Sequence, residues 1–176
     1  MRRPGAHTRT FAEAGSACLL LAAMALGCGS GAERSATFTI KQEIPLGIIS
    51  VTVMGWEEVP QIHPPFHSLD APAGEKAIAV FARWRGLDEY AELDQRQFVE
   101  SFLQHRLKLI DSEGYEASVI SVLPKALYDS SEMRGLAPRD WVVIYHIWVD
   151  SQGNTVQVRH PDPGEEDFDV ASVSLD

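Results

Sequence analysis

The sequence is short of cysteine, of basic residues and of long apolar runs. Its 176 residues include two cysteines, and its 15 lysines and arginines face 25 aspartates and glutamates, for a formal net charge of −10. This charge argues against nucleic-acid partners, which need basic side chains opposite their phosphates. The longest uninterrupted apolar run, from Ala17 to Leu26, has ten residues. A membrane-spanning helix needs about 20, so the sequence predicts none.

The N-terminal segment has the pattern of an export signal. Arg2, Arg3 and Arg9 precede the apolar run, whose length is typical of the hydrophobic region of a signal peptide. The residues that follow, Ala25-Leu26-Gly27-Cys28, resemble the lipobox of bacterial lipoproteins. This resemblance implies cleavage before Cys28, acylation of Cys28 with palmitate-type chains, and an extracytoplasmic, lipid-anchored place in the bacterial cell envelope. Ordinary secretion with a free Cys28 is the alternative.

This interpretation divides the chain into a signal peptide at 1–27, a lipidated cysteine and flexible tether at 28–36, and one domain at 37–176. Cys18 would leave with the signal and Cys28 would carry lipid, so no thiol would remain for a disulfide, a zinc site or a nucleophile. The signal holds three basic residues and one acidic residue, which leaves 12 basic and 24 acidic residues, a net charge of −12. Such a domain is repelled by anionic lipid head groups.

The remainder predicts an all-β fold with one short helix. Alternating apolar residues and short spacings between turns favour an antiparallel, immunoglobulin-like β-sandwich of about seven to eight strands. Between the strands, 59–75 and 124–140 are expected to be long loops, and 87–105 is the one helical segment. The predicted strands are 37–41, 48–56, 76–85, 106–111, 115–123, 141–149, 155–159 and 168–175.

Four segments together resemble a known domain. They are Ile48–Val53, the stretch from Gly74 to Trp84, the strand and D-x-x-G turn from Leu107 to Tyr115, and the stretch from Leu136 to Val149. In this order they are similar to the telokin-like, immunoglobulin-like domain of unknown function found in bacterial lipoproteins. The resemblance covers roughly residues 37–160. It implies a fold and supplies no reaction, because the family has no established activity.

Residues that could carry chemistry are few. His63 and His67 have the spacing of a metal-binding pair on a helix, but Pro64 and Pro65 between them exclude that helix. The acidic residues between Asp162 and Asp169 lack the order of a calcium-binding EF-hand loop. We therefore expect no cofactor, no metal and no catalytic residue. The alternative is a metal-assisted or hydrolytic envelope enzyme that uses the His63/His67 loop or the acidic C-terminal segment.

Loop positions predict where a partner would bind. If consecutive strands run antiparallel, 59–75 lies at the tether end of the sandwich, and 86–105 and 124–140 lie together at the far end. Residues 124–140 include residue types that are common at interfaces. Tyr128, Met133 and Arg134 are therefore the candidate partner-binding residues. In the alternative, Phe98 and Phe102 of the helical segment close the open end of the core.

Tryptophans on predicted strands, among them Trp84, Trp141 and Trp148, are interpreted as core residues. Without a catalytic motif, the function that the sequence favours is a non-catalytic binding or protein-interaction module of the cell envelope. An envelope protein whose identity is unknown is the expected partner.

Overall fold

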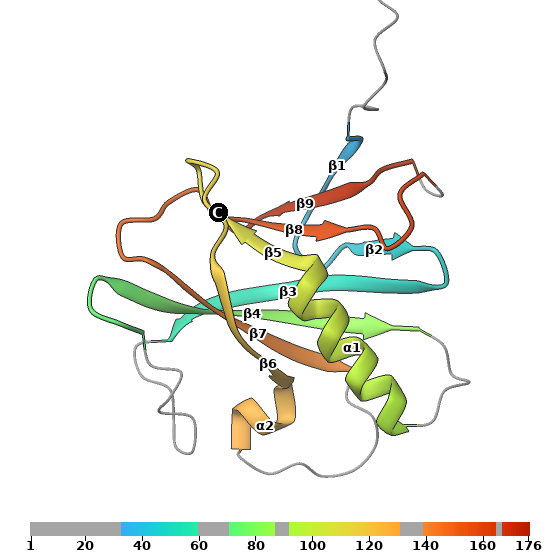
Figure 1. The fold of residues 1–176 in the computed structure, drawn as a ribbon, viewed down its shortest axis with the longest axis horizontal. Coiled ribbons are helices and arrows are strands. Elements are labelled where there is room, and N and C mark those ends of the chain that lie inside the picture. Colours follow the sequence, from blue (N-terminus) through green and yellow to red (C-terminus); the bar gives the residue numbers. More distant parts are fainter. Residues whose placement is uncertain (1–32, 60–70, 87–91, 131–138, 165–166) are drawn as a thin grey trace, which may run out of the picture. The chain divides into compact units, whose positions relative to one another are not determined.

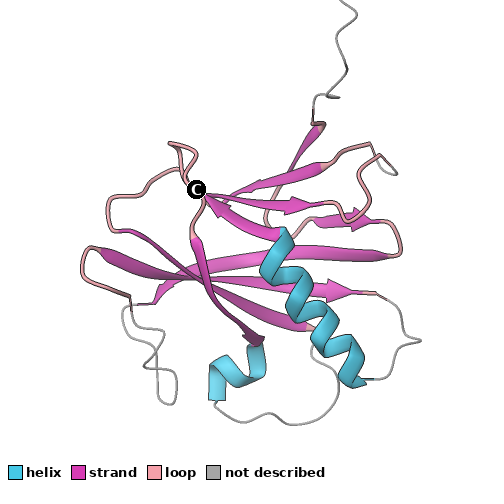
Figure 2. Ribbon diagram, in the orientation of Figure 1, coloured by secondary structure: helices cyan, strands magenta, loops and turns pink. Residues whose placement is uncertain are grey.

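The computed structural model describes residues 33–59, 71–86, 92–130, 139–164 and 167–176. In these residues the chain forms two β-sheets with a long and a short helix beside them (Figures 1 and 2). Side chains from both sheets share one hydrophobic core. The expected all-β sandwich is therefore confirmed. No helix of the described residues is both long and apolar enough to cross a membrane.

The larger sheet has five strands and is antiparallel throughout. Its interior strand β7 pairs with β4 on one side and with β6 on the other, as expected for a segment that is apolar on both faces. The strands, in their order across the sheet, are β2 (Glu43–Leu46), β3 (Ile49–Val59), β4 (Glu75–Arg85), β7 (Asp140–Trp148) and β6 (Ser118–Pro124).

The smaller sheet has four strands and contains one parallel pair. Its order is β1 (Ser35–Phe38), β9 (Val170–Ser174), β8 (Thr155–Arg159) and β5 (Leu107–Ile110). β1 runs parallel to β9, with Ser35 opposite Val170, whereas the other pairs are antiparallel. The expectation of a wholly antiparallel sandwich fails at this pair, because the chain enters at the end where β9 begins. The sheet also starts two residues before the predicted domain boundary at residue 37.

Both faces of β7 are buried, and different layers cover them. Trp141, Val143 and Tyr145 lie in the core between the sheets, and the Tyr145 hydroxyl donates to the carbonyl of Leu107 in the smaller sheet at 2.9 Å. Burial raises the pKa of this hydroxyl. The other face of the larger sheet packs against α2 (Lys125–Ser130), a helix within the segment expected to be a loop. The second layer explains why β7 is apolar on both faces.

The long helix α1 (Glu92–Arg106) belongs to the main core. Its Val99, Phe102 and Leu103 are buried, and the Phe102 ring meets Trp84 of β4 edge to face, with 5.2 Å between ring centroids. Phe98 contacts the same tryptophan but remains half exposed. The alternative interpretation, in which this segment closes the core, is thus confirmed for Phe102.

Strand β2 was not predicted, and it changes where the loops lie. Proline and glycine, here Pro45 and Gly47, are residue types that commonly end a strand. Pro45 is exposed on an edge strand, where a missing N–H is tolerated, and Gly47 supplies the positive φ of 74° for the tight turn into β3. The extra strand reverses the direction of those that follow.

The predicted loop positions are therefore corrected. Residues 71–74 adjoin the end of β7, far from Ser35, whereas Arg85 and Asp140 lie at the end where β1 begins (Figure 1). Residues 86–105 and 124–140 adjoin the same end of the larger sheet, where the amide of Trp84, two residues before the first segment, donates to the carbonyl of Arg139 in the second at 2.8 Å. The prediction that this meeting point faces away from the tether is wrong.

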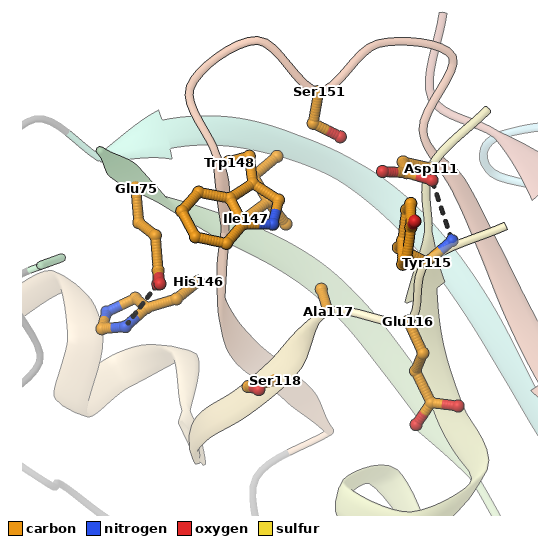
Figure 3. Close-up of a pocket in the computed structure, with 10 residues that line it drawn as sticks. All are labelled: Glu75, Asp111, Tyr115, Glu116, Ala117, Ser118, His146, Ile147, Trp148 and Ser151. Atoms are coloured by element: carbon orange, nitrogen blue, oxygen red, sulfur yellow. Dashed lines mark hydrogen bonds and ion pairs between the residues drawn. The ribbon is translucent and has the colours of Figure 1, made fainter. Parts of the chain in front are cut away.

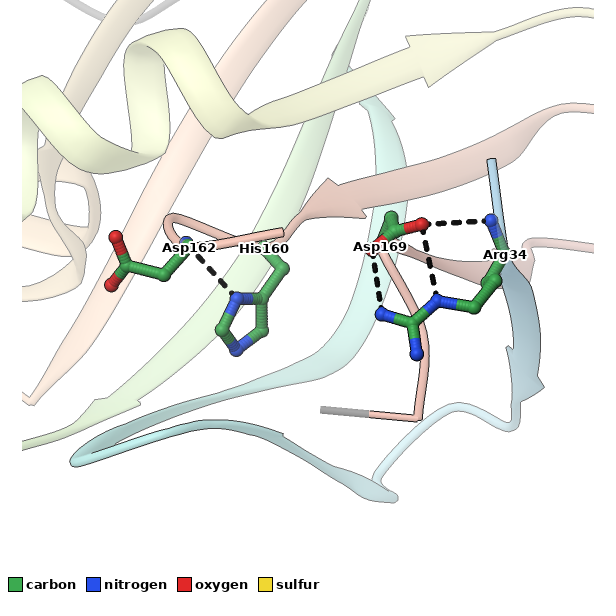
Figure 4. A network of polar contacts seen from close by, with 4 residues as sticks. All are labelled: Arg34, His160, Asp162 and Asp169. Carbon is green, nitrogen blue, oxygen red and sulfur yellow. Dashed lines mark hydrogen bonds and ion pairs between the residues drawn. The ribbon is translucent and has the colours of Figure 1, made fainter. Parts of the chain in front are cut away.

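An ion pair fixes the point where the chain enters the sandwich. Arg34 holds Asp169 through Nη2 to Oδ1 at 2.8 Å, through Nε to Oδ2 at 3.3 Å and through its backbone N–H to Oδ2 at 2.9 Å (Figure 4). The hydrogen bonds from the Arg34 side chain and backbone lower the pKa of the Asp169 carboxyl to about 2. This pair joins the start of β1 to the start of β9.

We expect Asp169→Asn to lower the melting temperature near neutral pH by a few degrees. Because the pKa of Asp169 is lower in the folded chain, its contribution is present above about pH 4 and is lost as the pH falls through about 2. Thermal melts of both proteins across this range should therefore converge at low pH. Asp176→Asn controls for the loss of one negative charge. A difference in melting temperature that is the same at pH 2 and pH 6 would contradict this account.

His160 is a buried polar residue beside this pair (Figure 4). Its Nδ1 accepts the backbone N–H of Asp162 at 3.0 Å, and its ring stands edge to face with Phe168. Among the described residues nothing hydrogen-bonds its buried Nε2. The ring thus satisfies one amide of the turn that follows β8.

Candidate functional site

Three connections gather at the end of the sandwich away from Ser35, on the left in Figure 1. They are the turn 111–117 after β5, the loop 149–154 after β7 and residues 71–74 before β4. Hydrogen bonds tie them together: the Ser112 amide donates to the Gln152 carbonyl at 3.0 Å, and the Val149 amide donates to the Gly74 carbonyl at 3.2 Å. We call this region the loop end. These hydrogen bonds between loops indicate a fixed surface on a rigid scaffold, which is where binding residues often lie.

The turn 111–117 forms because its sequence satisfies its own backbone. Asp111 Oδ1 accepts the amides of Glu113 and Tyr115, both at 2.9 Å, and Gly114 adopts a φ of 88°. Gly153 in the neighbouring loop also has a positive φ, and a Cβ there would lie 3.0 Å from the Cβ of Ser112. The glycine therefore allows the two loops to approach closely.

A cleft of about 160 Å³ opens between these loops (Figure 3). Trp148 stands on one side of it and Tyr115 on the other, with Ser151 above and Ala117 below. Both aromatic side chains are unusually accessible, at 58% exposure for Trp148 and 64% for Tyr115. The lining consists of Glu75, Asp111, Tyr115, Glu116, Ala117, Ser118, His146, Ile147, Trp148 and Ser151.

Two larger clefts lie beside this one. Their volumes are about 480 and 400 Å³, and Ser151 lines all three. Trp56, which is 41% exposed, lines the last of them and donates its indole N–H to the Leu175 carbonyl at 2.6 Å. Three accessible aromatic side chains, Trp148, Tyr115 and Trp56, thus line these clefts.

The electrostatic character of the loop end is negative. Two carboxylates of the loop end have basic neighbours. Glu116 Oε1 lies 2.7 Å from Lys108 Nζ, and Glu75 Oε2 lies 3.7 Å from His146 Nδ1. Among the described residues that line the three clefts, six acidic residues face one lysine, Lys76. The acidic residues are Glu75, Asp111, Glu113, Glu116, Asp150 and Asp176.

One row of residues at the cleft has the chemical composition of a hydrolytic site. Ser118 lies opposite His146 in the β-ladder, and Glu75 Oε2 is 3.7 Å from His146 Nδ1. A catalytic serine, histidine and carboxylate are joined by hydrogen bonds of about 2.6–3.2 Å. The 3.7 Å between Glu75 Oε2 and His146 Nδ1 lies outside that range.

The residues that sequence analysis selected lie elsewhere or outside the described part. Cys28, His63, His67, Met133 and Arg134 are outside the described residues, and what was predicted for them stays a prediction. In the acidic segment, the carboxylate of Asp169 is held by Arg34. Within the described residues, no group of three or more His, Cys, Asp or Glu side chains is arranged to hold a metal ion.

Tyr128 contacts the protein's own sheet. Its ring meets Phe81 of β4 edge to face, with centroids 5.9 Å apart, and its hydroxyl donates to Glu57 Oε1 of β3 at 2.7 Å. Burial, followed by this hydrogen bond, raises the pKa of the hydroxyl. These contacts give Tyr128 a structural role in docking α2 onto the sheet, beside any role in binding.

Sequence analysis missed Trp148, which it placed in the core. The alternation along β7 places Trp148 on the same face as Ile144, which packs with α2. The partner of Trp148 in the ladder is Glu75, however, and α2 does not extend to this tryptophan. Its ring lies over Gly74, where an added Cβ would be 3.9 Å from Cζ3. The one signal in the sequence was its place at the strand end, directly before Val149-Asp150.

No family model matches this chain, and no curated protein does. Two solved structures are similar to it in fold. An uncharacterised β-sandwich protein of Clostridium difficile has a TM-score of 0.49 at 12% identity, covering 82% of this chain and 96% of its own. A predicted lipoprotein of Bacillus subtilis has a TM-score of 0.39 at 10% identity, covering 76% of this chain and 38% of its own. Neither likeness bears on function.

Proposed function

We propose that this protein is a lipid-anchored, extracytoplasmic and non-catalytic binding module of the bacterial cell envelope, built on a telokin-like sandwich. The proposal rests on one observation: the chain enters the sandwich at one end, and the loop end lies at the other. Arg34 follows the predicted anchor Cys28 by six residues and enters the sandwich at the end opposite the loop end (Figure 1). Six residues span at most about 20 Å, so the entry end would be held near the membrane.

This arrangement would direct the loop end away from the lipid. The accessible Trp148 and Tyr115 would then face other molecules of the envelope. The carboxylates of the loop end support the same orientation, because anionic lipid head groups repel them. An envelope protein is the partner that we propose for this surface.

Anchoring is tested by replacing the acylated residue. Cells that express the chain are grown with a clickable palmitate analogue, and we expect the wild type to be labelled and Cys28→Ser to lose the label entirely. Cys28→Ser should also leave the membrane fraction, because two acyl chains are what hold the domain there. Cys18→Ser is the matched control and should retain the label. Label that persists on Cys28→Ser would contradict the proposal.

Binding is tested separately by photo-crosslinking in cells. A photoreactive residue in place of Trp148 should yield a specific adduct with another envelope component. The same residue in place of Phe98, which is similarly exposed at 53% against 58%, should not. Equal adducts from both positions would show that the loop end has no preference over the rest of the surface.

A further inference from the structure

The aromatic walls of the small cleft point to a particular kind of ligand. Trp148 and Tyr115 lie on opposite sides of it (Figure 3), and both residues are more than half exposed. Large aromatic side chains that remain exposed on a cross-linked scaffold mark interaction sites more often than isolated surface residues do. The faces of indole and phenol rings attract cations, with tryptophan the stronger of the two.

The charges around the cleft favour the same ligand. Glu75 lies on the Trp148 side and Asp111 on the Tyr115 side, whereas Glu116 points away from the rings and is paired with Lys108 at 2.7 Å (Figure 3). The neighbouring clefts add further carboxylates and a single lysine, Lys76, which is 3.3 Å from Glu58. A phosphate or another anion would meet net repulsion here, whereas a cation would meet carboxylates and aromatic faces together.

The sizes of the clefts indicate how much of a ligand each can hold. A volume of about 160 Å³ is enough to hold the end of one side chain. The neighbouring clefts of about 480 and 400 Å³ share Ser151 with it and leave room for the residues on either side of that side chain. This succession of one small and two larger hollows suits an extended peptide.

We propose that the cleft between Trp148 and Tyr115 receives the ammonium or guanidinium group of a lysine or arginine in a basic peptide segment of a partner protein. The inference rests on the proposed binding function and adds the chemistry of the ligand. The cation would lie between the two rings and near the carboxylates of Glu75 and Asp111, while the flanking peptide would follow the larger clefts.

The test uses the full chain in a non-ionic detergent and fluorescein-labelled peptides of alternating glycine and a second residue. Fluorescence anisotropy should show binding when the second residue is lysine, and binding should weaken as salt is raised. Peptides with glutamate or with norleucine, which is nearly isosteric with lysine but uncharged, should bind at least tenfold more weakly. Equal binding of the norleucine peptide would overturn the cationic assignment.

Two variants locate the site. Trp148→Ala should weaken binding of the lysine peptide about tenfold, since it removes the stronger aromatic wall, and should leave the melting temperature unchanged because the side chain is exposed. Phe98→Ala removes an equally exposed ring elsewhere and should leave the affinity unchanged. Identical affinities of the wild type and Trp148→Ala would show a diffuse charge attraction and overturn the inference.

The outcomes separate this inference from the proposed function. If Trp148 crosslinks a partner in cells but the lysine peptide does not bind, the binding module stands and the ligand class is wrong. If the lysine peptide binds through Trp148 but Cys28→Ser retains its lipid label, the anchoring is wrong and the cation site stands.

Discussion

Val143→Asp is expected to abolish folding. Val143 is fully buried on β7, the strand between β4 and β6, and its side chain lies in the core between the two sheets. An unpaired carboxylate buried there costs several kcal/mol, even if it takes up a proton. Whole domains are stable by only about 5–15 kcal/mol. The variant should appear in inclusion bodies or show no cooperative thermal transition by circular dichroism.

Val149→Asp is the matched control for this substitution. Val149 directly follows β7 and is 58% exposed, so the same chemical change there leaves the new carboxylate in water. We expect its melting curve to match that of the wild type. If Val143→Asp yielded a soluble protein with a wild-type melt, Val143 would not lie in the core and the assignment of β7 as an interior strand would be wrong.

The interior strands β4 and β7 could be predicted from the sequence because their apolar residues show which faces are buried. β7 is apolar on both faces, and apolar residues recur along one face of β4, so the predicted bounds of both strands lie within a residue or two of those observed. The helix that covers the outer face of the larger sheet, α2, could not be predicted. The helix α2 has six residues, too few to show a helical period or to be stable alone. Packing of Leu127 and Tyr128 against the sheet holds it in place.

The direction of the strands was mispredicted for a local reason. Proline and glycine usually end a strand. Here, however, Pro45 is compatible with an edge strand and Gly47 with the hairpin turn that follows it. Whether β2 forms depends on burial of Ile44 and Leu46 against the rest of the core, which is a tertiary contact. One unrecognised strand of four residues was enough to place every later loop at the wrong end.

The candidate site shows the same limit. The turn that begins at Asp111 is visible in the sequence, because aspartate and glycine at that spacing satisfy a tight turn. Its contact with Gln152 and the exposure of Trp148 depend on which loops the topology brings together. A tryptophan on a strand is usually buried, so the residue that defines the cleft was assigned to the core.

The second large effect is expected at α1. Leu103 is fully buried in the core shared by the two sheets, and Leu103→Ala should reduce the free energy of unfolding by about 2–5 kcal/mol. Alanine is the best helix former, so the loss would report packing alone. Equilibrium unfolding in urea should show a lower midpoint with an unchanged slope, which indicates that the same surface is exposed on unfolding.

Gln104→Ala, on the exposed side of the same helix, makes the comparison decisive. It also introduces alanine one position along the helix, but it removes no buried atoms, so its midpoint should stay within experimental error of the wild type. If α1 were an appendage on the surface of the sandwich, the two variants would behave alike. A difference between them of several kcal/mol would instead show that the segment between β4 and β5 completes the core, and that the entry end of the sandwich is closed by packing.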